Sequence, residues 1–164
     1  MPPFVTHEGK EFYHLALRKA ADFALPFPPT PYVCLVWDHG AEWSTEERSA
    51  LTTAVVASDC RYAVCGGTGC ERWHDDFDET FLGLVPEAEQ EERFLMTTWH
   101  TDEPPLEVAW FFAWNTYSDT EPFTRFLVLE LGTASQPATV LEPVVRRAVL
   151  ECDAVIDELE AGAG

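Results

Sequence analysis

The apolar run YVCLVW, residues 32–37, constrains the fold more than any other stretch of this sequence. Six residues without a charge suit a strand that is buried on both faces, as in a parallel sheet. Further runs rich in apolar residues at 61–65, 93–99 and 124–132 predict three more strands. Helical patterns separate these runs. Strands that alternate with helices indicate right-handed crossovers and a sheet covered on both sides.

The helices that separate the strands have local signals. Ser44 and Glu47 form a capping box that predicts a helix over 44–58. A second helix is predicted over 70–82. A third begins at two prolines, which are tolerated in a first turn, and a fourth runs from a second capping box at Thr139 to the end of the chain.

The N-terminal part of the chain is set apart by a proline cluster. Residues 8–24 carry apolar side chains at helical spacing and predict an amphipathic helix. The stretch LPFPPTP at 25–31 excludes helix and predicts a stiff connector. We therefore expect an N-terminal helix and connector over 1–31 and an α/β domain over 32–164. The predicted architecture is a single three-layer domain with a four-stranded, mainly parallel sheet, Rossmann-like or flavodoxin-like, plus that helix.

Composition narrows the class of partner. The 29 acidic and 10 basic residues give a formal charge of −19, which repels phosphate backbones and anionic membranes and predicts binding to neither. The same charge suits either a solvated surface or a surface that binds a basic partner protein. Five cysteines, an odd number without the spacing of a disulfide framework, predict reduced thiols. With no secretory signal visible, we expect a cytoplasmic protein.

Polar residues follow the first three predicted strands, at the sheet edge where ligands of open α/β proteins bind. Asp38 comes directly after the first strand, the glycine loop CGGTGC follows the second, and His100 follows the third. Asp38 can orient an imidazole, act as a base or cap the turn at Gly40. Asp102 can simply cap the following helix, whereas His100 has no such structural role and ranks above Asp102 as a candidate.

The glycine loop matches no standard phosphate-binding fingerprint. It lacks the third glycine of the dinucleotide motif and the lysine of the P-loop. Its amides, together with Arg72 in the first turn of the next helix, can still hold an anion. The alternatives are a glycine turn that only permits positive φ and an arginine balanced by the neighbouring aspartates.

Cys70 and His74 lie four residues apart on one face of that next helix. They are either a packed stripe facing the core or a reactive thiol with its base, because a helix N-terminus lowers the pKa of a cysteine. A third interpretation is zinc held by Cys65, Cys70 and His74 with His100 or His39. These residues lack the spacing of standard zinc motifs, so no metal is assigned.

Two classes of function follow. The first is a protein that binds a small, anionic molecule at the ends of the first three strands, in the manner of a hydrolase or transferase; whether it is an enzyme stays open, and no cofactor is assigned. The predicted catalytic residues are Cys70, His74, His100 and Asp38, and the predicted ligand contacts are Cys65, Gly67, Thr68, Gly69, Arg72, Thr98 and Trp99. The second class is a non-catalytic acidic interaction module, an immunity- or antitoxin-like or regulatory partner of a basic protein. The apolar helix Trp110–Tyr117 predicts a cover for its outer face, either by the N-terminal helix or by a second subunit in a homodimer.

The blocks CERWHDDFDE and TTWHTDEPPLEVAWFF, within residues 33–117, resemble a bacterial family of small uncharacterised α/β proteins. The resemblance implies a compact bacterial domain and carries no activity.

Overall fold

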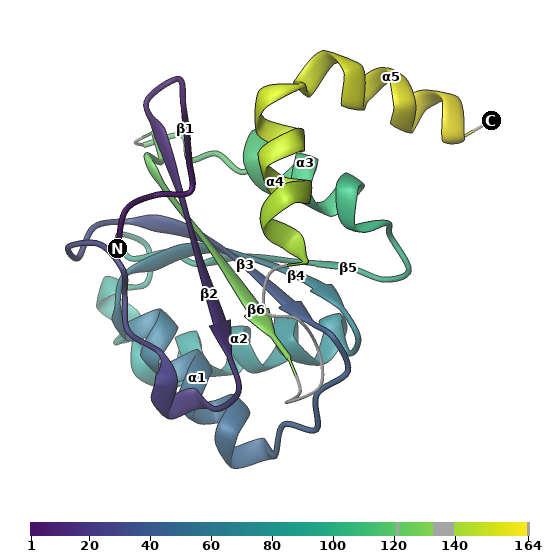
Figure 1. Cartoon of the computed structure of the whole chain (residues 1–164). Coiled ribbons are helices and arrows are strands. Elements are labelled where there is room, and N and C mark those ends of the chain that lie inside the picture. Colours follow the sequence, from purple (N-terminus) through teal and green to yellow (C-terminus); the bar gives the residue numbers. More distant parts are fainter. Residues whose placement is uncertain (121, 133–139, 164) are drawn as a thin grey trace.

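The computed structural model describes residues 1–120, 122–132 and 140–163 (Figure 1). Strands and helices alternate along most of this chain. The strands are β1 (Val5–His7), β2 (Lys10–Leu17), β3 (Tyr32–Asp38), β4 (Cys60–Gly67), β5 (Met96–His100) and β6 (Arg125–Leu131). The helices are α1 (Thr45–Ala57), α2 (Cys70–Leu84), α3 (Pro105–Trp114), α4 (Leu141–Leu150) and α5 (Cys152–Gly162), with short 3-10 turns at Ala20–Asp22 and Glu87–Glu89.

The strands form one sheet in the order β1-β2-β6-β3-β4-β5. All neighbouring pairs are parallel except β1 and β2, which are antiparallel. The mixed α/β class and the mostly parallel sheet are thus confirmed, but the described sheet has six strands rather than four. The likeness to Rossmann or flavodoxin folds stays a prediction.

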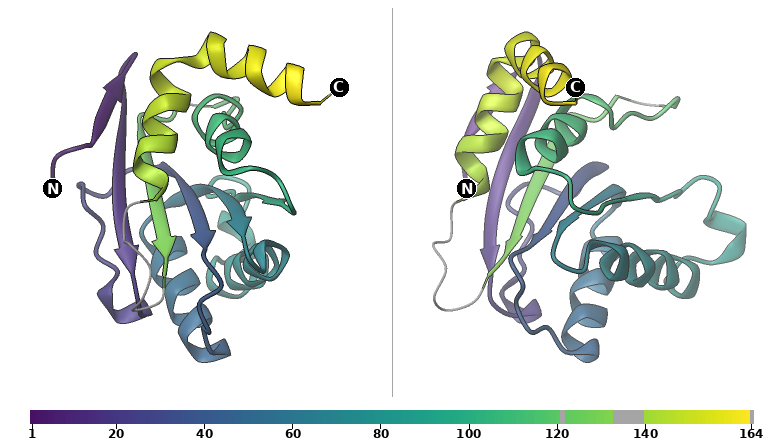
Figure 2. Two further views of the ribbon diagram at one scale, coloured as in Figure 1. Left: turned by 45° about the vertical axis from the view of Figure 1, so that its right-hand side comes forward. Right: turned by 90° about the vertical axis from the view of Figure 1, so that its right-hand side faces the viewer.

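The two faces of the sheet carry separate apolar clusters. The side chains of Cys34, Val36 and Leu129 pack toward α1 and α2. Those of Val33, Leu35 and others, which alternate with the first set along the strands, pack toward α3 and α4. Figures 1 and 2 show α1 and α2 grouped on one side of the sheet and α3 and α4 on the other. This double burial explains why β3 reads as a continuous apolar run.

The predicted N-terminal helix over 8–24 is wrong. Residues 10–17 form β2, which pairs with β6 along its whole length. Phe12 and Tyr13 are both buried, one on each side of the sheet, which the helical spacing did not anticipate. Gly9, with a φ of 78°, turns the chain from β1 into β2. The helical spacing of residues 8–24 is not supported by a capping residue. Pairing of β2 with the buried strand β6 therefore decides the structure of this segment. The division of the chain at residue 31 stays a prediction, although β2 lies within the common sheet.

The other predicted helices are present with shifted bounds. Ser44 caps α1 as expected, its hydroxyl accepting a hydrogen bond from the Glu47 amide at 3.2 Å. The last predicted helix is two helices, because the backbone at Glu151 leaves the helical region and α5 turns away from the body of the protein (Figure 1). Its expected cap, Thr139, lies outside the described residues. Within the described chain, no helix is both long enough and apolar enough to span a bilayer.

Candidate functional site

The order of the strands reverses between β3 and β6. From β3 the chain proceeds outward through β4 to β5, and α3 then returns it to β6 on the other side of β3. The following helices, α1 and α4, lie on opposite faces of the sheet. In open α/β sheets, ligands bind beside the carboxyl ends of strands at such a reversal.

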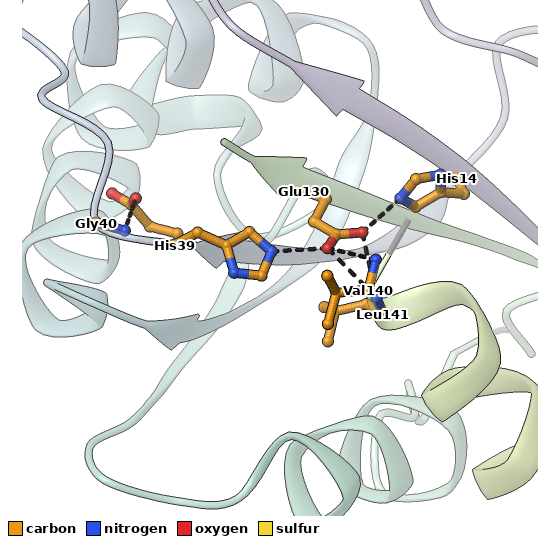
Figure 3. A network of polar contacts seen from close by, with 7 residues as sticks. His14, His39, Gly40, Glu130, Val140 and Leu141 are labelled. Atoms are coloured by element: carbon orange, nitrogen blue, oxygen red, sulfur yellow. Dashed lines mark hydrogen bonds and ion pairs between the residues drawn. The ribbon is translucent and has the colours of Figure 1, made fainter. Parts of the chain in front are cut away.

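A carboxylate shared by two histidines lies at this reversal (Figure 3). Glu130, near the end of β6, is only 2% exposed. Its two oxygens each lie 2.7 Å from an imidazole Nε2, that of His39 beyond β3 and that of His14 on β2. The side chains of His14 and His39 are 10% and 14% exposed. A backbone hydrogen bond from His39 to the Leu131 carbonyl, 3.0 Å long, holds His39 beside β6.

The carboxylate of Glu130 also meets the start of α4. The Val140 amide donates to Oε1 at 3.0 Å, and the Leu141 amide lies 3.3 Å from both oxygens. Glu130 therefore satisfies amides that the helix itself leaves free, as a capping side chain does. The positive end of the helix dipole favours the negative charge at this position.

These contacts set the ionisation state of Glu130. Burial alone would raise the pKa of Glu130, but the hydrogen bonds from His14, His39 and the Leu141 amide outweigh it and hold the pKa below its usual value. An ionised carboxylate only accepts hydrogen bonds, so both Nε2 atoms must carry hydrogen. In a neutral ring this leaves Nδ1 as the nitrogen with the free lone pair.

Sequence reasoning missed two of the three members of this site. Glu130 had a readable signal: it continues the alternation of Phe126 and Val128, so it is a charged residue at an inward position of a buried strand. His14 was placed on a helix that does not form. His39 was considered only as an alternative zinc ligand.

The glycine loop predicted as the site closes against the end of β3. The Thr68 amide donates to the Asp38 carbonyl at 2.8 Å. Gly67 has a φ of 77°, and a Cβ there would lie 2.3 Å from the same carbonyl oxygen. Asp38 is buried: its carboxylate accepts from the amides of Gly40 and Ala41 and from the Trp73 indole, each at 2.9 Å. Within the described chain, these contacts match the turn-capping alternative for Asp38.

The other predicted catalytic residues are divided between the two faces of the sheet. His74 packs against Trp99 with ring centroids 4.5 Å apart and the rings tilted by 60°, on the side of α2. On the opposite side, His100 packs against Phe111 of α3 with the rings tilted by 59°. His100 also forms hydrogen bonds with Glu103 at 2.7 Å and with Thr98 at 3.2 Å. Trp99 and His100 are consecutive in β5, and consecutive strand residues face opposite ways. His74 and His100 therefore lie on opposite faces of the sheet rather than in one cleft.

The predicted thiols are enclosed. Burial raises the pKa of Cys65 well above its usual value, with further contributions from Cys70 and Cys60, so its thiolate is disfavoured. Cys70 is also buried and lies 3.6 Å from the Thr101 hydroxyl. Arg72 is exposed. In the part of the chain that the structure describes, no cluster of three or more histidine, cysteine or acidic side chains is arranged to hold a metal.

Comparison with known sequences assigns the chain to a family. No curated protein and no solved structure matches it significantly. Residues 12–147, which include His14, His39 and Glu130, match a family described as "Domain of unknown function (DUF7684)". Because the match spans most of the sequence, the chain belongs to the DUF7684 family.

Proposed function

We propose that this protein binds a small polar molecule at the carboxyl ends of β2, β6 and β3, with His14 and His39 as its proton-exchanging contacts. One observation carries the proposal: a buried, ionised Glu130 is shared by two imidazoles at the reversal of strand order. The sequence indicates the ends of β3, β4 and β5 instead, so the two locations share only β3. The residues differ from those that the sequence indicates.

The chemistry of the pair is that of oriented bases. Glu130 holds Nε2–H of each ring, so Nδ1 can accept a hydrogen bond or a proton from a ligand hydroxyl or amine. The carboxylate then stabilises the imidazolium that forms, as the orienting acid does in hydrolase triads. A hydrolase or transferase that uses such a base fits this site better than one that uses a thiol, because Cys65 and Cys70 are buried.

The proposal is tested by NMR, which reports which nitrogen of each imidazole ring carries the hydrogen. Long-range proton–nitrogen NMR spectra of the two histidines should show the Nε2–H form for both rings in their neutral state. A screen of small polar compounds by thermal shift identifies binders, since a ligand at one hundred times its Kd stabilises a protein by about 2.7 kcal/mol. A true binder should move the Nδ1 resonances of His14 and His39.

The matched variants are H14Q and H39Q. Glutamine can place an amide nitrogen close to the position of Nε2 and keep a donor for Glu130, but it has no basic nitrogen. Binding should weaken in these variants while the fold is retained. If every compound that binds wild-type protein binds the double variant equally well, Glu130 and its histidines serve only to hold α4 on the sheet.

The second candidate is the acidic interaction module. The formal charge of −19 favours it, because long-range attraction accelerates association with a basic protein. A basic partner of this kind would bind with strong salt dependence and would be unaffected by H14Q and H39Q. The predicted homodimer through Trp110–Tyr117 is tested by sedimentation equilibrium.

A further inference from the structure

A second hollow lies away from Glu130, between α3 and α5. Its volume is about 490 Å³, within the roughly 300–1,000 Å³ of small-molecule sites. His100 and the α3 residues Glu107, Trp110 and Phe111 line one side, and Leu159 and Glu160 of α5 line the other. The hollow thus joins acidic, aromatic and aliphatic groups from separate parts of the chain.

The charge of the hollow has one sign. Its lining includes the carboxylates of Glu103, Glu107 and Glu160 and includes no lysine or arginine. Glu103 is bonded to His100. Glu107 and Glu160 are exposed, and no ion pair joins either of them to another residue of the described chain. These two carboxylates raise the local concentration of cations and repel anions.

The aromatic rings that line the hollow also favour a cation. The faces of Trp and Phe rings attract cations, and tryptophan does so most strongly. The Trp110 indole Nε1 is buried and has no hydrogen-bond partner among the described residues.

The chain already shows the same chemistry at the end of α3. The Lys10 ammonium donates to the Ala113 carbonyl at 2.8 Å and lies 4.5 Å from the centre of the Trp114 ring. The Lys10 ammonium group is held by these two contacts, and Lys10 does not line the hollow. The cation that the hollow suits must therefore come from outside the described chain.

We infer that the hollow between α3 and α5 binds an alkylammonium group, with Glu107 and Glu160 as its counter-charges and Trp110 and Phe111 as its apolar and aromatic wall. The inference stands apart from the proposed function, because none of these residues contacts His14, His39 or Glu130. The ammonium group can belong to a free amine or to a lysine side chain of a peptide, and the two sources share this chemistry.

The test uses n-butylammonium and a capped Gly-Lys-Gly peptide, with butyrate and butanol as anionic and neutral controls. The Trp110 indole N–H resonance, assigned with W110F, is followed in NMR titrations at constant ionic strength. Ligands of so few atoms bind weakly, so titrations extend to about 50 mM. We expect saturable shifts with one or both ammonium ligands and none with butyrate; which of the two binds more tightly identifies the source.

The E107Q/E160Q double variant should weaken ammonium binding at least about fivefold. The control is E71Q/E79Q, which removes the same charge from exposed positions of α2 outside the hollow. An equal loss in both double variants means general attraction to an acidic protein and overturns the inference. Equal shifts with butyrate, or no saturable shift with either ammonium ligand, overturn it as well.

Discussion

At the scale of single residues, the Glu130 carboxylate is the centre of a network of hydrogen bonds at the end of β6. Its carboxylate accepts from two histidines on flanking segments and from the first amides of α4. A buried charge costs free energy unless such partners surround it. The contacts that make Glu130 a candidate for function therefore also make it a structural centre.

Replacing Glu130 by glutamine should lower the free energy of unfolding by roughly 2–4 kcal/mol at neutral pH. The amide of glutamine brings hydrogens toward Nε2–H groups that need acceptors. Urea unfolding followed by tryptophan fluorescence measures the loss. E142Q, which breaks only an exposed ion pair with Arg146 on α4, should cost less than about 0.5 kcal/mol.

The stability that Glu130 supplies should depend on pH. Its pKa is lower in the folded protein than in the unfolded chain, so its contribution is complete above the usual glutamate pKa of about 4.3 and is lost as the pH falls through the folded value. The difference in the free energy of unfolding between wild type and E130Q should therefore become smaller below about pH 4.3. A difference that stays constant from pH 7 to pH 3 would contradict this assignment.

Gly67 and Gly69 offer a second comparison between residues. Both have positive φ, 77° and 65°, which costs alanine about 1–2 kcal/mol. A Cβ on Gly69 meets no atom within 4 Å, whereas one on Gly67 meets the Asp38 carbonyl at 2.3 Å. Thermal unfolding should show G67A to be less stable than G69A. Equal stabilities would mean that the loop moves to relieve the contact.

At the scale of elements, the sequence predicts strands best where both faces of the strand are buried. The predicted strands within β3, β4 and β6 are present because a strand covered on both faces needs an uninterrupted apolar run. β2 was missed because its side chains also fit a helical period, and only its partner, far along the chain, decides between the two. The separation of His74 and His100 could not be predicted for a similar reason: proximity to a strand end does not state which face of the sheet a side chain takes.

The cap of α1 provides a test at this scale. Ser44 accepts from the Glu47 amide, while the Glu47 carboxylate accepts from the Ala20 amide at 2.7 Å instead of reaching back to Ser44. S44A should lower the free energy of unfolding by about 1 kcal/mol, and S44D should restore most of it. If S44A has no effect, the start of α1 is held mainly by the link from Glu47 to Ala20.

At the scale of the whole molecule, net charge dominates. Self-repulsion among charges that sum to −19 destabilises the compact state and is screened by salt. Several ion pairs in the described chain join two exposed side chains, and such pairs contribute little.

Raising NaCl from about 0.02 to 0.5 M should therefore increase the Tm by about 2–6 °C. KCl should act equally, which separates screening from a specific effect of sodium. A Tm that falls with salt would show that the ion pairs outweigh the repulsion.

The position of β6 between β2 and β3 has a consequence for synthesis. His14 and Glu130 lie 116 residues apart in the sequence, so a ribosome releases β2 long before the strand that pairs with it exists. At about 5–20 residues per second, the wait is roughly 6–23 s. Throughout that time β2 is a strand with an open edge, and the sheet lacks its central member. Nascent chains of this protein therefore expose an unpaired edge of β2 until β6, which ends at Leu131, has been synthesised.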